Sequence, residues 1–86
     1  MYKIALFASY KPGIEVTKFL KKQKDLEIES LYLTGKDPIN DKKIATLSGL
    51  NKNKIFYKRE SYENEKHINF FKRKKIDCLI TVFWPW

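Results

Sequence analysis

Residues 4–8 read Ile-Ala-Leu-Phe-Ala, an unbroken apolar run near the start of an 86-residue chain. A short run without polar alternation is typical of a strand that is covered on both faces, as in a parallel sheet. Residues 78–83, Cys-Leu-Ile-Thr-Val-Phe, form a second run of this kind near the other end. The two runs predict two central, fully covered strands that begin and end the fold.

Helices and shorter strands are expected between these runs. Apolar spacing and charge order predict helices over residues 14–22, 41–47 and 63–75, with Asn40 as the cap of the second. Strands are expected over residues 26–33 and 54–57. This alternation predicts an α/β fold, a Rossmann-like half domain whose four-stranded parallel sheet has the order 3-2-1-4, with helices on both faces.

The composition limits the classes of protein. The chain has 86 residues, of which 43% are hydrophobic and 33% charged, so we expect one small globular domain and exclude a disordered chain. A single cysteine and the lack of a long apolar segment lead us to expect a cytoplasmic protein without a membrane partner. The net charge of +8 allows nucleic-acid binding, but scattered lysines favour a solvated surface instead.

The loop after the first strand is the first candidate site. Doubly wound sheets bind ligands at the carboxyl ends of their strands, where the winding reverses, and here that point lies between the first and fourth strands. The loop, residues 9–13, has a single glycine, so neither a dinucleotide fingerprint nor a phosphate loop is present. Ser9, Lys11 and the start of the next helix could hold an anion, and an ordinary turn with a solvated lysine is the alternative.

No catalytic residue or metal ligand is predicted. His67 is the sole histidine, and no cysteine or carboxylate stands at metal-ligand spacing from it. We expect Cys78 to be a small buried hydrophobic residue, and Asp37, Glu60 and Asp77 to be caps or solvated groups.

The last residues of the chain are unusual because Trp84 and Trp86 stand at a bare end. We expect a chain truncated after the fourth strand, with a missing C-terminal segment that packs on that strand. Flat rings at the predicted ligand edge also suit a planar heterocycle.

Three stretches of the chain together point to a family. They are residues 3–7 (Lys-Ile-Ala-Leu-Phe), 31–38 (Leu-Tyr-Leu-Thr-Gly-Lys-Asp-Pro) and 76–86 (Ile-Asp-Cys-Leu-Ile-Thr-Val-Phe-Trp-Pro-Trp). With them the chain resembles the N-terminal part of the formyltransferases that use 10-formyltetrahydrofolate, which include methionyl-tRNA and nucleotide-sugar formyltransferases. The resemblance spans residues 1–86 as a single domain.

The resemblance implies transfer of a formyl group from 10-formyltetrahydrofolate to an acceptor amine. The residues that match the start of the folate-binding segment are Phe83, Trp84, Pro85 and Trp86. The residues that match the loop facing the acceptor, and are substrate-binding candidates, are Ser9, Tyr10, Lys11 and Gly13. The family's catalytic Asn, His and Asp lie beyond the fourth strand, so we expect this chain alone to be inactive, with weak or absent folate binding.

The first loop departs from the family pattern. It lacks both the glycine-rich turn of purine-pathway members and the Gly-Thr turn of tRNA-directed members, which leaves the acceptor undefined.

Two alternatives to a formyltransferase stay open. A fragment of another Rossmann-like transferase, of the glycosyltransferase type, would show the same alternation of strands and helices. A small basic module without catalytic activity, binding nucleic acid or another protein, is the other alternative.

Overall fold

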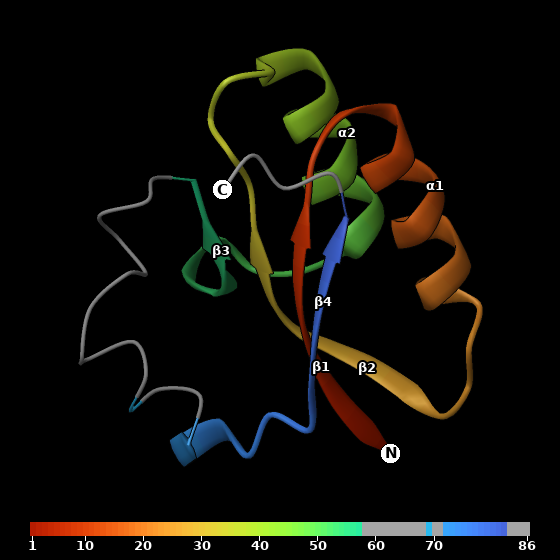
Figure 1. Cartoon of the computed structure of the whole chain (residues 1–86), viewed down its shortest axis with the longest axis vertical. Coiled ribbons are helices and arrows are strands. Elements are labelled where there is room, and N and C mark those ends of the chain that lie inside the picture. The colour runs from red at the N-terminus through yellow and green to blue at the C-terminus, as the bar shows by residue number, and fades with distance from the viewer. Residues whose placement is uncertain (58–68, 70–71, 83–86) are drawn as a thin grey trace.

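The computed structural model describes residues 1–57, 69 and 72–82, and Figure 1 draws the remaining residues as a thin grey trace. The strands form one parallel sheet in the order β3-β2-β1-β4, which confirms the predicted α/β fold class. In chain order the elements are β1 (Tyr2–Ala8), α1 (Tyr10–Lys21), β2 (Leu26–Tyr32), α2 (Pro38–Ser48), a short 3₁₀ helix η1 (Lys52–Lys54), β3 (Ile55–Phe56) and β4 (Cys78–Val82).

β1 is an inner strand, paired with β2 on one side and β4 on the other. Ile4, Leu6 and Ala8 point to the same face of the sheet and are buried. That face packs against α1 and α2, which lie side by side in Figure 1, and the fully buried Ile44 of α2 belongs to the same cluster. The main core therefore lies between the sheet and these two helices.

The opposite face of the sheet carries an aromatic ladder across three strands. Phe7 of β1, Tyr32 of β2 and Phe56 of β3 are register partners whose rings stack, with centroid distances of 4.3 and 5.2 Å. Tyr32 is fully buried. The helix predicted over residues 63–75 to cover a face of the sheet falls mostly outside the described residues, of which 69 and 72–74 are helical.

The prediction that the last strand is fully covered is wrong for the described part of the structure. β4 is an edge strand of the sheet, and Leu79 is 55% exposed. Cys78 is also exposed, so the expectation of a buried thiol is wrong as well. Only Ile80 and Val82 pack against the main core, because they share the face of β4 that looks toward α1.

Both described helices begin earlier than the sequence predicted. α1 begins at Tyr10 because Pro12 lies in its first turn, where a backbone N–H would have no partner within the helix. α2 begins at Pro38 and its cap is Asp37, so the prediction of Asn40 as the cap is wrong. The Asp37 carboxylate accepts the backbone N–H of Asn40 and, at 2.6 Å, its side-chain amide. Proline is favoured in the first position of a helix, next to such a cap.

Candidate functional site

The carboxyl ends of β1 and β4 meet at one edge of the sheet. The two strands are parallel, and Ala8, the last residue of β1, pairs with Val82, the last residue of β4. The loop that begins at Ser9 leaves the sheet at this edge and enters α1 directly, as Figure 1 shows. The two apolar runs of the sequence are therefore neighbours, and the predicted site lies where their chains diverge.

Ser9 and Tyr10 make the turn between β1 and α1. Ser9 is extended and fully buried, and its carbonyl accepts the N–H of Gly13 at 3.0 Å. Tyr10 has a φ of 59°, in the left-handed region that residues other than glycine seldom occupy. A strained conformation of this kind persists only where the surroundings impose it, and such residues are frequent at functional sites. The turn brings the first N–H groups of α1 to the sheet edge.

Gly13 has a packing role. A Cβ at this position would lie 3.0 Å from Cδ1 of Ile44 and 3.2 Å from Cβ of Ala8, which is closer than ordinary contact. Glycine therefore lets α1 approach both α2 and the end of β1. Of the four substrate-binding candidates, Ser9 and Gly13 are buried, Tyr10 is partly buried and Lys11 is exposed. A ligand at this edge would reach Tyr10 and Lys11 first.

The predicted cofactor-binding residues lie outside the described part of the chain. They are Phe83, Trp84, Pro85 and Trp86. The residue before them, Val82, is partly buried against the core and ends β4 beside β1. The structure thus gives the point from which this segment leaves the sheet. Folate binding by the segment stays a prediction.

The sequence did not point to Asp41, a buried carboxylate near the same edge. Asp41 is 2% exposed, and its Oδ2 accepts the N–H of Gly35 at 3.1 Å. Its Oδ1 is buried and has no hydrogen-bond partner. Burial raises the pKa of the Asp41 carboxyl above its ordinary value, and the charge of Asp37 raises it further, while hydrogen bonds from the backbone lower it. A protonated Asp41 would carry an O–H donor inside the fold.

Asp41 ties the β2–α2 turn to α2. Gly35 has a φ of 76°, and the Oγ1 of Thr34 accepts the N–H of Lys36 at 3.1 Å, so the turn is held from both sides. The spacing of Asp41, Ile44 and Ser48, all buried on one side of α2, was the signal in the sequence that could have placed the carboxylate inside. Because both carboxylate oxygens are enclosed, the structure gives Asp41 a local role in holding the turn.

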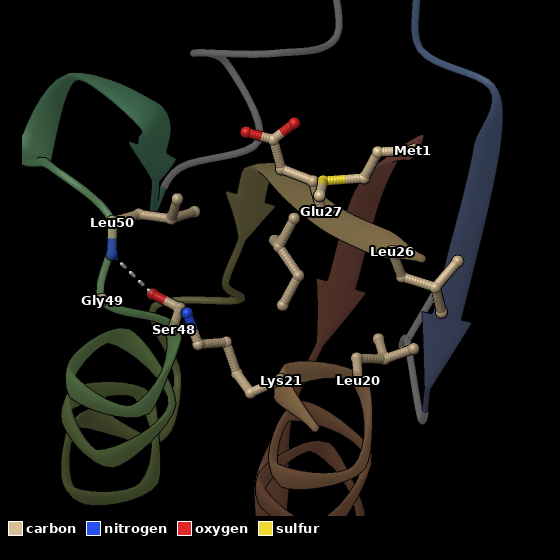
Figure 2. A pocket seen from close by; sticks show the side chains of 9 residues that line it. Met1, Leu20, Lys21, Leu26, Glu27, Ser48, Gly49 and Leu50 are labelled. Atoms are coloured by element: carbon tan, nitrogen blue, oxygen red, sulfur yellow. Dashed lines mark hydrogen bonds between the residues drawn. The ribbon is translucent and has the colours of Figure 1, made fainter. Parts of the chain in front are cut away.

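A separate pocket lies at the amino edge of the sheet, opposite the predicted site (Figure 2). Its volume is about 240 Å³, below the roughly 300–1,000 Å³ of most small-molecule sites. The side chain of Lys21 reaches toward the end of α2, where its Nζ lies 3.6 Å from a Cβ placed on Gly49. The pocket is lined by Met1, Leu20, Lys21, Leu26, Glu27, Ile28, Ser48, Gly49 and Leu50. Aliphatic side chains share the lining with polar groups, among them Lys21, Glu27 and Ser48.

Comparisons with protein-family models, with curated proteins and with solved structures found no match. Within residues 1–57, 69 and 72–82, no three His, Cys, Asp or Glu side chains gather where they could hold a metal ion. Over the same residues, no helix is long and apolar enough to cross a membrane. The family resemblance therefore rests on the sequence stretches quoted above and stays a prediction.

Proposed function

We propose that this chain is the N-terminal part of a formyltransferase that moves a formyl group from 10-formyltetrahydrofolate to an acceptor amine. One observation carries the proposal. The parallel pairing of Ala8 with Val82 joins the end of β1 to the end of β4, immediately before the residues 83–86 that resemble the folate-binding segment. Ligands of doubly wound sheets bind at such an edge.

The proposed roles divide between the two strand ends. Aromatic residues 83, 84 and 86 offer flat rings on which a pterin ring could stack. Tyr10 and Lys11, at the start of α1, face the acceptor side. Formyl transfer also requires donors that stabilise the negative oxygen of the tetrahedral intermediate, and the family's catalytic residues have no match in these 86 residues. The chain alone would therefore bind folate weakly and catalyse no transfer.

The chain provides a selective probe for the folate half of this proposal. Its only two tryptophans are Trp84 and Trp86, so intrinsic tryptophan fluorescence reports on the proposed folate segment alone. We expect 5-formyltetrahydrofolate to change this fluorescence saturably, after correction for its own absorbance, and Trp84→Ala to weaken the response. Tyr57→Ala, an exposed aromatic residue outside this segment, is the matched control.

Three outcomes would count against the proposal. A response to nucleotide sugars in place of folate would favour the glycosyltransferase alternative. A response to RNA that falls steeply with salt would favour the basic binding module. Continuation of the reading frame beyond Trp86 without an Asn-x-His segment would remove the family's catalytic residues, whereas its presence, with formyl transfer by the extended protein, would support the proposal.

A further inference from the structure

An open groove is lined by residues of α1 and α2, the two helices that lie side by side in Figure 1. Its volume is about 640 Å³, and all its lining residues are exposed or partly buried. They are Ile14, Lys18, Ile39, Lys42, Lys43, Thr46 and Leu47. The groove is therefore distinct from the carboxyl edge of the sheet and from the amino-edge pocket.

The floor of the groove is aliphatic because Ile39 and Leu47 of α2 and Ile14 of α1 line it. Ile44 is fully buried, Leu47, almost one turn further along α2, is partly buried, and Ile39 lies in the first turn of the helix. Ile39 is 71% exposed. A surface helix that packs on one side alone usually has a single apolar stripe. Ile39 extends the apolar surface of α2 beyond its buried side, whereas Leu47 is partly buried and Ile14 of α1 also packs against the main core.

The rim of the groove is positively charged. Lys42 and Lys43 are exposed, and within the described residues neither has a carboxylate at ion-pair distance. Lys18 on the other side lies 3.7 Å from Glu15, an exposed pair that salt would screen. An apolar floor between cationic rims is complementary to a helix with one apolar stripe flanked by carboxylates.

The length of the groove also suits a helix. The lining residues of α2 run from Ile39 to Leu47, a distance of about 12 Å along the helix axis. A partner helix of about three turns would span this length and place apolar side chains at i, i+3 or i+4, and i+7 along the floor. This is the helix-in-groove mode of peptide recognition.

We propose that the α1–α2 groove docks an acidic amphipathic helix of a partner protein. Aliphatic side chains of the partner would contact Ile14, Ile39 and Leu47, and its glutamates or aspartates would pair with Lys42 and Lys43. The proposal goes beyond formyl transfer and does not depend on it, because the groove lies on the helices and not at the strand ends.

The test uses a fluorescent synthetic peptide of about three to four helical turns, with leucines at helical spacing and glutamates on both flanks. Its binding to the 86-residue chain is followed by fluorescence anisotropy. A peptide of the same composition with a scrambled order, and one with lysine in place of glutamate, are the controls. We expect saturable binding of the first peptide and at least about tenfold weaker binding of both controls.

Two variants place the binding in the groove. Ile39→Glu, which changes an exposed side chain, and Lys43→Glu, which reverses a rim charge, should each weaken binding about tenfold or more. Phe19→Glu is the matched control, because Phe19 is 61% exposed on α1 but does not line the groove. Circular dichroism checks that each variant is folded. If Ile39→Glu does not fold, the peptide affinity of Lys43→Glu decides whether the peptide binds in the groove.

Several results would overturn the proposal. Equal binding of the scrambled peptide would show a response to charge alone, and an equal loss in Phe19→Glu would remove the groove as the site. Self-association that Ile39→Glu abolishes, without peptide binding, would assign the groove to a second copy of the chain. Displacement of the peptide by an RNA hairpin with higher affinity would assign the rim to nucleic acid.

Discussion

β1 and β4 have similar apolar sequences, but the two strands differ in how much of each is buried. Both are short apolar runs, and both were predicted to be covered on two faces. In β1, Ile4, Ala5 and Leu6 are at most 2% exposed. In β4, Leu79 is 55% exposed and Cys78 is exposed, although each pairs directly with a buried residue of β1.

The difference shows that position in the sheet order decides burial. β1 has a strand on each side and helices over one face, whereas β4 pairs with β1 alone among the described strands. Apolar side chains that remain in water gain none of the roughly 25 cal/mol per Å² that burial supplies. A run as apolar as β4 fits the expectation that a further segment packs on this strand, which stays a prediction.

The largest expected difference between the two strands is in stability. Leu6→Ala removes a fully buried side chain from the main core and should lower the free energy of unfolding by about 2–5 kcal/mol. Leu79→Ala, the matched change in β4, should lower it by less than about 1 kcal/mol. Chemical denaturation followed by circular dichroism measures both. Equal losses would mean that Leu79 is covered in solution, and the contrast between the strands would then fail.

A smaller loss is expected where β1 ends against α1. Gly13→Val would push side-chain atoms toward Ile44 and Ala8, and we expect it to lower the free energy of unfolding by about 1–3 kcal/mol. Glu15→Val puts the same β-branched residue on the exposed side of α1 and should cost less than about 1 kcal/mol. The two variants are compared by thermal denaturation. If Gly13→Val left the free energy of unfolding unchanged, α1 would be able to move away from β1 at little cost.

The sequence was sufficient for the strand order because β1 and β4 are the longest apolar runs and strands alternate with helices throughout. It also placed the loop at Ser9 beside the end of β4, since the carboxyl ends of parallel strands share an edge. Whether Tyr10 and Lys11 contact a substrate depends on a ligand and on residues 83–86, which lie outside the described structure. Their function therefore stays a prediction.

The remaining details depend on tertiary contacts. Glu29 has the polar character of an exposed residue but is 6% exposed, because a register shift pairs Ala5 with Ser30. Its carboxylate lies 3.5 Å from the ammonium of Lys54, which compensates the burial. Asp41 is buried because α2 starts at Pro38, three residues before the predicted start. The sequence of β2 does not reveal the register shift, whereas the helical spacing of Asp41, Ile44 and Ser48 does indicate the buried side of α2.

Asp41 of α2 holds the turn that follows β2, the strand that pairs with β1. Its pKa is raised above 3.8, so the native state holds the proton more tightly than the unfolded chain does. The stability that the protonated carboxyl contributes is complete below about pH 3.8 and is lost as the pH rises through the higher native pKa. Asp41→Asn should therefore be more stable than the parent at neutral pH, by up to about 1 kcal/mol, with the advantage shrinking toward low pH.

Two measurements check this expectation. Urea denaturation at several pH values gives the difference between the parent and Asp41→Asn, and an NMR titration of the Asp41 carboxyl carbon gives its pKa directly. The asparagine can still accept the N–H of Gly35 through its side-chain oxygen, so the turn should be retained. A titration at or below the ordinary value would mean that water or another group reaches Oδ1 in solution.

The smallest effect is expected at Cys78, the residue of β4 that pairs with Ile4. An exposed thiol in a folded protein reacts with an aromatic disulfide reagent without unfolding, so native Cys78 should be labelled completely, at a rate within about tenfold of the urea-unfolded chain. Cys78→Ser should change the free energy of unfolding by less than about 0.5 kcal/mol. Strong protection of the thiol would instead show that a second copy or another segment covers this edge. In that case β4 would resemble β1 after all, and its apolar sequence would be accounted for by that cover.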